Sequence, residues 1–336
     1  MPIKTFFLSA IIFLISNILF NYYIDSGNRF YNEKKNNSKI YNDLQNNNIL
    51  SLNIASNERI FKKQLINYYK DTKRKFDILV CGSSRAGLID KSVLASESIL
   101  NVHVNSFTIY DLYSLCLVSV KNFKPKVVIL ELQPNFFNVN NNFLGLADWE
   151  VLEEDYSAEN YNLKKNILDY KKRKYLELIN FQYTKNNLVK IFNWVKKENA
   201  NQYNDDGSYL QKNELINIEY VRAISRNSAS NPLFINTKWD EKVELELINF
   251  LKIIKKENLK IIFILPPFHP AFFEEIVKKN NFYELSEEKI INIAKKFNIN
   301  ILGSFKISKT LCREYEYTDS HHPLQSCYKN LLKDRL

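Results

Sequence analysis

The sequence predicts an α/β protein, a three-layer α/β/α sandwich with a parallel sheet, behind an N-terminal transmembrane helix. Short apolar runs without alternation, typical of strands buried on both faces, take turns with segments whose apolar residues recur at helical spacing. One such run, Ile78–Cys81, ends abruptly in Gly82-Ser83-Ser84. Open parallel sheets bind ligands beyond the carboxyl ends of their strands, so these serines fall where chemistry usually takes place.

The bulk properties allow a large core and favour anionic surroundings. Of the 336 residues, 45% are hydrophobic, and the net charge is +10. This charge suits phospholipid headgroups, acidic polymers or nucleic acid, but it equally fits a solvated lysine-rich surface. The four cysteines show no C-x-x-C spacing, which argues against zinc. Cys81 and Cys116 lie in apolar stretches and are expected to act as small core residues, whereas Cys312 and Cys327 are near enough to pair.

The N-terminus predicts a membrane anchor over residues 1–24. Thr5–Ile24 holds 20 residues without a charge, and at 1.5 Å per residue it spans about 30 Å, the thickness of the hydrocarbon core. A cleavable signal peptide is the alternative, but no A-x-A-like site is found after the apolar run. Lys4 lies on one side and Arg29 on the other, so the positive-inside rule is ambiguous. We expect the bulk of the chain outside the cytoplasm, because N-terminal anchors of this kind commonly export the domain attached to them.

Residues 25–75 are polar and rich in asparagine, which predicts a stalk with a helix around Ile60–Tyr69. Residues 76–140 form the first half of the predicted α/β domain, and residues 241–336 form the second. Their expected strands are Ile78–Cys81, Asn101–Phe107, Val127–Leu132, Ile261–Leu265 and Ile299–Leu302. Their expected helices are Leu112–Val120, Val243–Ile254, Ala271–Lys279 and Glu284–Phe297. Strands separated by helices imply right-handed crossovers and a parallel sheet.

The rhythm is interrupted over residues 141–240, which we expect to form a mainly helical insertion at one end of the sheet. The segment begins acidic and then becomes basic, with ten Lys or Arg against three Asp or Glu between Leu163 and Asn199. A lid, a binding surface for an anionic polymer and a plain solvated helical face all fit this composition.

Two segments at opposite ends of the chain hold residue types suited to nucleophilic catalysis. A serine hydroxyl is a poor nucleophile until a base takes its proton, and a carboxylate must orient that base. Ser84 supplies the hydroxyl, and the Asp319-x-x-His322 spacing places a carboxylate beside an imidazole. Pro323 is expected to open the final helix. Asp319, His321 and His322 also suit a metal, but no other His or Cys cluster accompanies them, so neither a metal nor a cofactor is expected.

Gly82-Ser83-Ser84 and the stretch from Asp319 through His322-Pro323 to Tyr328 together resemble the SGNH (GDSL-type) hydrolase superfamily. In that superfamily a Gly-Asp-Ser block comes after the first strand, and a late Asp-x-x-His-Pro runs into a helix. The resemblance implies a flavodoxin-like sandwich in which Ser84 is the nucleophile, His322 the base and Asp319 the orienting acid.

The resemblance further implies an oxyanion hole from the Ser84 amide, Ser106 and Asn135. Here the sequence departs from the family pattern: Ser83 replaces its aspartate, Ser106 replaces its glycine, and Asn135 lacks the usual Gly-x-Asn context. The Gly-Ser-Ser variant behind an N-terminal anchor is similar to the envelope-polymer acyltransfer branch, which includes alginate-acetylation and D-alanyl-transfer accessory proteins.

Two further residues are candidates for substrate binding. Arg85 suits contact with an anionic substrate, a cap on a carboxylate or a surface role, and His269 either lines the crevice beyond its strand or is a loop histidine set by neighbouring prolines. The chain lacks G-x-S-x-G, which argues against an α/β-hydrolase elbow, and it lacks the glycine-rich nucleotide motifs.

The combined prediction is a membrane-anchored serine esterase or O-acyltransferase acting on acyl groups of a cell-envelope polysaccharide or related polymer. Its expected partners are an acylated glycan, the membrane and a membrane acyltransferase. The alternative is a catalytically degenerate domain that binds an envelope polymer or scaffolds a partner acyltransferase. A nucleic-acid surface on the basic insertion is the weakest interpretation, because an exported location excludes it, so no nucleic-acid partner is expected.

Overall fold

The computed structural model describes residues 3–24, 41–46, 50–52, 58–96, 98–140, 175–176, 178–196, 201–210 and 216–333. It divides into two compact units. The first comprises residues 1–64 and 148–202, and the second comprises residues 65–147 and 203–336. The second unit therefore includes the end of the predicted stalk (residues 25–75) and the last part of the predicted insertion (residues 141–240). Much of the predicted stalk and of the insertion lies outside the described residues.

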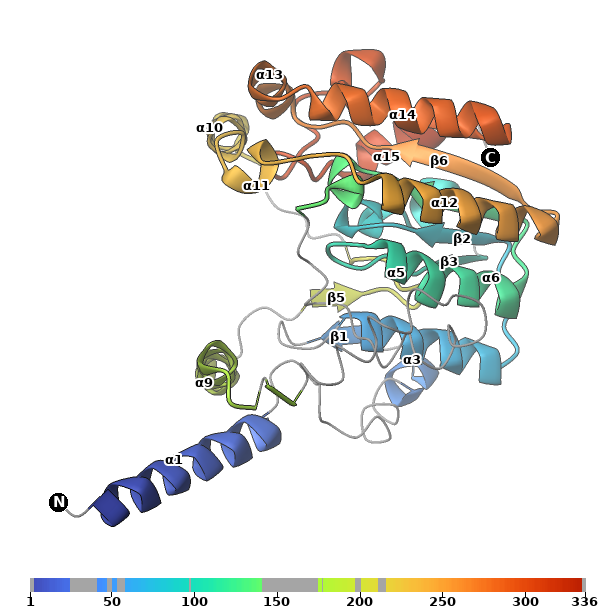
Figure 1. Cartoon of the computed structure of the whole chain (residues 1–336). Coiled ribbons are helices and arrows are strands. Elements are labelled where there is room, and N and C mark those ends of the chain that lie inside the picture. Colours follow the sequence, from blue (N-terminus) through green and yellow to red (C-terminus); the bar gives the residue numbers. More distant parts are fainter. Residues whose placement is uncertain are drawn as a thin grey trace. The chain divides into compact units, whose positions relative to one another are not determined.

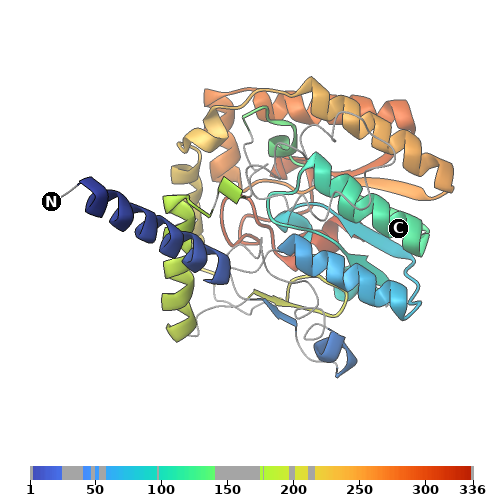
Figure 2. The same ribbon diagram turned by 60° about the horizontal axis from the view of Figure 1, so that its bottom comes forward.

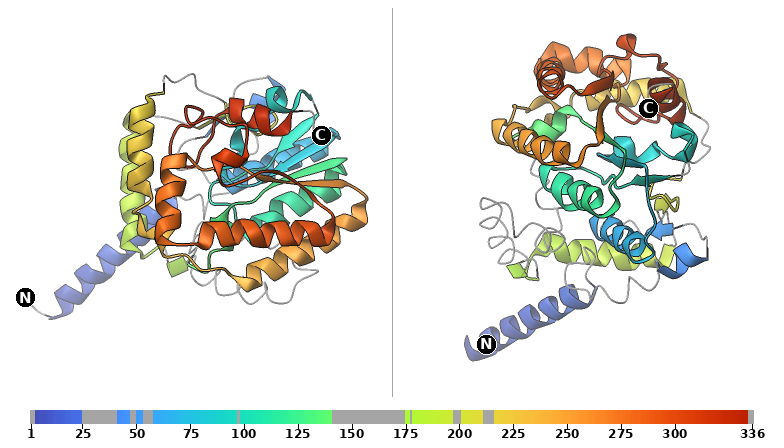
Figure 3. Two further views of the ribbon diagram at one scale, coloured as in Figure 1. Left: turned by 90° about the horizontal axis from the view of Figure 1, so that it is seen from above. Right: turned by 90° about the vertical axis from the view of Figure 1, so that its right-hand side faces the viewer.

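The second unit is built on a five-stranded sheet in the order β3-β2-β4-β6-β7, and every pair is parallel. The apolar strands are buried because helices cover both faces, as Figures 1 and 3 show. This order is that of flavodoxin-like sheets and confirms the predicted three-layer sandwich. The strands are β2 (Ile78–Cys81), β3 (Ile99–Asn101), β4 (Val127–Glu131), β6 (Lys260–Leu265) and β7 (Asn300–Gly303).

The helices of this unit lie on the two faces of the sheet. One face carries α4 (Lys91–Leu94) and α15 (Gln325–Leu332), whose side chains share a core with β2, β4, β6 and β7. The other layer contains a π-helical turn (Leu112–Leu117), α12 (Glu241–Ile254) and α14 (Phe282–Phe297), in contact one with the next. The remaining helices include α5 (Ile109–Asp111), α6 (Val118–Phe123), α10 (Ile218–Ser228), α11 (Pro232–Ile235) and α13 (Pro270–Lys279). Helix α3 (Glu58–Asp71) begins in the first unit and ends in the second.

The second strand differs from its predicted range. β3 ends at Asn101 instead of continuing to Phe107. The Asn101 side chain turns to the carbonyls of Ala86 and Ile89, at 2.9 Å each. The chain beyond it still runs beside β2, because the Val104 amide donates to the Gly82 carbonyl at 3.0 Å. The apolar residues after Asn101 are therefore buried next to β2 without forming a strand.

All four cysteines are paired, which corrects the expectation for the first two. Cys81 at the end of β2 is bonded to Cys116 in the π-helical turn, so these residues form a crosslink rather than free core thiols. Cys312 is bonded to Cys327 in α15. The first bridge ties the end of β2, just before Ser84, to the π-helical turn, and the second ties the segment that leads to Asp319 to α15.

The first unit contains α1 (Ile3–Ile24), α9 (Phe181–Lys196) and the short strand β1 (Leu50–Leu52) paired with β5 (Asn201–Tyr203). Within α1, Thr5–Ile24 is long and apolar enough to cross a membrane. This finding supports the predicted anchor, whereas the orientation of the chain across a bilayer stays a prediction. Figure 2 shows α1 and α9 packed across one another.

Candidate active site

Ser84 lies at the carboxyl edge of the sheet, where the backbone leaves β2. It opens a 3-10 turn, η1 (Ser84–Leu88), and the Ser83 hydroxyl caps this turn by accepting from the Arg85 amide at 3.2 Å. Gly82 is required before this turn because β4 passes directly against it. A methyl group on Gly82 would lie 2.5 Å from Cβ of Glu131. The close approach lets the Ser83 amide donate to Oε2 of Glu131 at 2.7 Å.

Arg85 fixes the turn from its other side. Its guanidinium lies over the Phe268 ring, 4.1 Å from the centroid, and donates to the carbonyls of Pro266 and, at 2.9 Å, Pro267. The side chain is buried in the protein interior. This position does not fit the predicted contact with an anionic substrate. Arg85 instead joins the serine turn to the end of β6, and the Tyr328 hydroxyl on α15 donates to its carbonyl.

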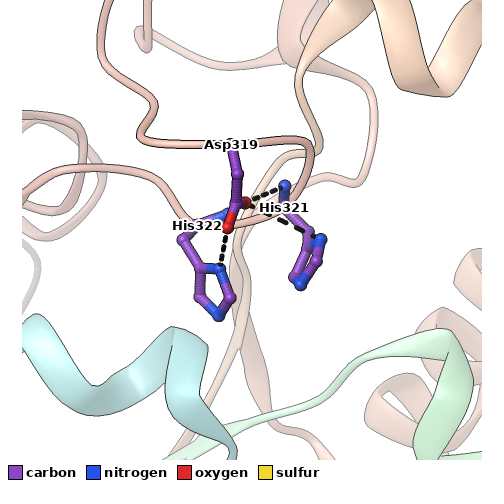
Figure 4. Close-up of side chains that lie close together, drawn as sticks. All are labelled: Asp319, His321 and His322. Atoms are coloured by element: carbon purple, nitrogen blue, oxygen red, sulfur yellow. Dashed lines mark hydrogen bonds and ion pairs between the residues drawn. The ribbon is translucent and has the colours of Figure 1, made fainter. Parts of the chain in front are cut away.

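The base comes from a loop that its own carboxylate organises. Oδ1 of Asp319 accepts from the amides of His321 at 2.8 Å and His322 at 2.9 Å, while Oδ2 lies 2.7 Å from Nδ1 of His322. Figure 4 shows both rings beside this carboxylate. A carboxylate only accepts, so Nδ1 of His322 carries the proton and Nε2 is left as an acceptor. That Nε2 lies 2.9 Å from Oγ of Ser84, so the structure brings these three side chains together.

The loop is held by backbone contacts from two directions. The Thr318 amide donates to the His322 carbonyl at 3.1 Å, and Tyr317 and Pro323 form a β-bridge. Pro323 therefore precedes the final helix instead of opening it, because α15 begins at Gln325. This bridge fixes the turn just before and just after the base.

His269 belongs to the support of this loop and is fully buried. Its amide donates to the Ser320 carbonyl at 3.0 Å, and its Nδ1 caps α13 by accepting from the Ala271 amide at 3.2 Å. Burial lowers the pKa of His269, although its Nε2 lies 3.6 Å from a carboxylate oxygen of Glu314. The predicted role of this residue in lining the crevice and binding substrate does not fit such a position. The ring is directed inward by the cap on α13, while the backbone amide supports the loop.

The electrostatics separate the two histidines of the loop. Burial lowers the pKa of His321 to about 3, helped by the neighbouring His322. His321 therefore stays neutral, and its Nδ1 lies 2.8 Å from the Ser320 hydroxyl. Burial raises the pKa of Asp319, but the hydrogen bond to His322 and the charges of both rings outweigh it and hold that pKa well below its usual range. Asp319 is thus a carboxylate wherever His322 works as a base.

The metal alternative involves the same atoms. One ligand atom each from Asp319, His321 and His322 lies within 4.8 Å of the others. The Asp319 oxygen and the His322 nitrogen nearest each other already share a hydrogen bond, and the second His322 nitrogen meets Ser84. An ion held by either ring nitrogen of His322 would therefore displace one link of the chain from Asp319 to Ser84.

The two residues predicted for an oxyanion hole lie on segments that come after the strands next to β2. Ser106 lies after β3 and has a φ of 54°, in the left-handed region that favours glycine, the residue of the resembled family at this position. Asn135 lies after β4, in the 3-10 turn Pro134–Phe137. Their part in an oxyanion hole stays a prediction.

Glu131 is a buried residue of the candidate site that the sequence analysis did not single out. It is buried at the end of β4, where burial raises its pKa against the opposing charge of Arg85. Through the Ser83 amide it fixes the backbone next to the serine. The sequence did contain a pointer to this residue, because Glu131 is the only charged residue in the apolar run Val127–Leu132.

Two solved structures are similar to this chain at low sequence identity. One is a "putative acylhydrolase" from Bacteroides fragilis, with 11% identity, a TM-score of 0.36, and coverage of 79% of this chain and 92% of that chain. The other is a "putative GDSL-like lipase" from Parabacteroides merdae, with 10% identity, a TM-score of 0.36, and coverage of 77% and 94%. The fold assignment rests on the sheet itself, whose strand order confirms the predicted flavodoxin-like sandwich.

No curated protein matches the chain. One family model matches residues 154–335, and its description reads "Protein of unknown function (DUF1574)". The matched segment includes Asp319 and His322, whereas Ser84 lies before it.

Proposed function

The chain belongs to the family described as "Protein of unknown function (DUF1574)", and from its site we propose that it is a membrane-anchored serine esterase or O-acyltransferase. One observation carries the proposal: Oγ of Ser84 lies 2.9 Å from Nε2 of His322, whose Nδ1 lies 2.7 Å from Asp319. A hydroxyl, an imidazole and a carboxylate in this sequence are the parts that acyl transfer through a covalent intermediate requires.

In the first half of the proposed reaction, Oγ of Ser84 attacks the carbonyl carbon of an ester while Nε2 of His322 takes the hydroxyl proton. Asp319 stabilises the imidazolium through its hydrogen bond to Nδ1. The tetrahedral intermediate then collapses, the ester bond breaks, and His322 returns the proton to the departing alcohol. The acyl group is left on Ser84.

In the second half, His322 removes a proton from an incoming hydroxyl, which attacks the acyl-serine. The serine leaves with that proton, and the enzyme is restored. Water as the acceptor gives an esterase, and a sugar hydroxyl gives an O-acyltransferase. The Ser84 amide, Ser106 and Asn135 are the proposed donors to the oxyanion in both halves.

The disulfides and the apolar helix support a cellular compartment for this reaction. Disulfides persist in oxidising compartments and are rare where thiols are kept reduced. All four cysteines are paired, and α1 is long and apolar enough to cross a bilayer. We therefore assign the α/β unit to the extracytoplasmic side, where an acylated envelope polysaccharide or related polymer is the proposed substrate and a membrane acyltransferase a proposed partner.

A second candidate is a degenerate domain that binds an envelope polymer or scaffolds a partner acyltransferase. The departures from the family pattern at Ser83, Ser106 and Asn135 favour it. It predicts a folded protein with an intact polymer-binding surface and no covalent chemistry at Ser84.

Hydrolysis of p-nitrophenyl acetate by Ser84→Ala and Ser83→Ala variants separates the two candidates. The proposed mechanism predicts that Ser84→Ala lowers kcat by about a thousandfold or more, because the nucleophile is gone. Ser83→Ala is the matched control, since it removes only the cap on the Arg85 amide, at a cost of about 1 kcal/mol of stability. Equal rates in Ser84→Ala and the wild type would exclude the enzymatic proposal.

A further inference from the structure

One face of α9 exposes large apolar side chains along its length. Phe181 is 82% exposed, Phe192 is 68% exposed, and Leu188 and Val189 between them are 44% and 47% exposed. At 100° per residue these side chains fall on one side of the helix. Tyr175, Leu176 and Ile179 extend the exposed set just before α9. The exposed Lys185 lies within this stripe, so the face is apolar with one basic residue in it. An exposed apolar face of this kind marks a surface that is covered in use.

A neighbouring side of α9 is fixed to the end of the apolar helix α1 through Thr184 and Asn187. The fully buried Asn21 of α1 donates through its amide to Thr184 at 2.9 Å and to the Leu178 carbonyl at 2.7 Å. In return, Asn187 donates to Oδ1 of Asn21 at 2.8 Å. Because Asn187 lies about 120° around the helix from Phe181, the apolar face of α9 points to one side of the contact with α1 and is left uncovered by it.

The two helices cross rather than run together. Figure 1 views α9 along its axis while α1 is seen from the side, and Figure 2 shows α9 lying across α1. The contact with Asn21 lies in the last turn of α1, next to Tyr22 and Tyr23. Tyrosines are enriched where a spanning helix leaves the hydrocarbon core. A helix that crosses a spanning helix at this level runs along the membrane surface.

The charge of this part of the chain matches an anionic lipid surface. Between Leu163 and Asn199 the sequence has ten Lys or Arg against three Asp or Glu. Three of these basic residues, Lys185, Lys190 and Lys196, lie on α9, which has no Asp or Glu. A basic helix with an apolar face is typical of helices that bind in the interface of anionic bilayers. A protein partner needs no such charge, so the composition favours lipid as the occupant.

We infer that α9 is a second membrane element, an interfacial helix whose apolar face enters the outer part of the bilayer beside the end of α1. The inference rests on the anchoring of α1 that forms part of the proposed function. Interfacial helices bury their apolar face about 5–10 Å into the boundary between headgroups and acyl chains. Phe181, Leu188 and Phe192 are the side chains that would enter it. With two contacts instead of one, the first unit is held against the lipid surface.

The paired cysteines make a direct test possible, because an introduced cysteine is the one free thiol of the chain. The full-length variants F192C and L14C are labelled with an environment-sensitive fluorophore and reconstituted in vesicles of phosphatidylcholine and phosphatidylglycerol. The matched control is L245C, since Leu245 on α12 is an equally apolar residue, 60% exposed. Lipids brominated near the headgroup or near the bilayer centre then report the depth of each label.

The inference predicts a blue shift and a loss of fluorescence for F192C with lipids brominated near the headgroup, and neither change for L245C. If F192C behaves as L245C does while L14C is quenched from the bilayer centre, α1 is anchored and the inference about α9 is wrong. If L14C is not quenched, the anchoring premise itself fails. A blue shift of F192C without quenching by any bromolipid would show that the label is buried against protein, such as a second copy of the chain, and would also overturn the inference.

Discussion

Replacement of Asp319 by asparagine tests how the proposed triad depends on one carboxylate. Oδ1 of Asp319 accepts two backbone amides, and Oδ2 lies 2.7 Å from Nδ1 of His322. An asparagine keeps one oxygen for the backbone amides and so preserves the loop. Its NH2 group then faces Nδ1 of His322, and this group can only donate.

The consequence is a change of tautomer at the base. Nδ1 of His322 must accept from the new amide, so the ring proton moves to Nε2, which faces Ser84 at 2.9 Å. A protonated Nε2 cannot take the serine proton. In a serine protease triad the corresponding change lowers kcat about 10⁴-fold. This factor equals about 5.4 kcal/mol of transition-state stabilisation.

The assay is steady-state hydrolysis of p-nitrophenyl acetate, together with thermal unfolding. The matched control is Asp240→Asn, because Asp240 also accepts a backbone amide, that of Lys242 at 2.9 Å, at the start of α12. We expect Asp240→Asn to retain wild-type kcat and Asp319→Asn to lose about four orders of magnitude while it stays folded. A folded Asp319→Asn variant within about tenfold of the wild-type kcat would refute the tautomer argument.

Three further predictions concern stability. The pKa of His321 is about 3 in the folded protein and about 6.5 in an unfolded chain. As the pH falls from about 6.5 to about 3, only the unfolded chain binds this proton, so the free energy of unfolding decreases. His321→Gln should therefore lose less thermal stability than the wild type between about pH 7 and about pH 4, and equal losses would contradict this cause. Gly82→Ala should lower the free energy of unfolding by about 1–3 kcal/mol and reduce esterase activity, because its methyl group would lie 2.5 Å from Glu131; an unchanged denaturation midpoint would count against this close packing. Reduction of the disulfides, with separations of 35 and 15 residues, should cost roughly 4 and roughly 3 kcal/mol, and denaturant titration without a shift on reduction would show that the bridges do not stabilise the fold.

Local patterns in the sequence were sufficient for the sheet and for the residues of the candidate triad. A strand buried on both faces is an apolar run without alternation, so β2, β4 and β6 could be predicted from the apolar pattern of the sequence. Asp319 and His322 were visible because their contact is local, three residues apart. The contact between Ser84 and His322 joins residues 238 positions apart. Its prediction depended on a family resemblance, because no pattern in the intervening residues indicates it.

The direction in which a buried polar side chain points was not predictable in the same way. Arg85 and His269 lie just past strand ends and have the chemistry of binding residues, yet both side chains turn inward. Arg85 donates to the carbonyl of Pro267, far along the chain, and the His269 ring accepts from the amide of Ala271. Glu131 and the Cys81–Cys116 bridge depend likewise on contacts between neighbouring elements. The exposure of the apolar face of α9 was not predictable from the sequence. The same apolar spacing is found in helices of a buried core, and only the contact with α1 distinguishes the two cases.

Labelling with a fluorophosphonate probe tests the account most directly. The probe reacts with a serine hydroxyl only where a base activates it and donors receive the oxyanion. Peptide mass mapping of the folded, full-length protein should place the adduct on Ser84, and the His322→Ala variant should remain unlabelled. An adduct on any other serine, or an unmodified Ser84 in folded wild-type protein, would contradict the assignment of this site as an acyl-transfer centre.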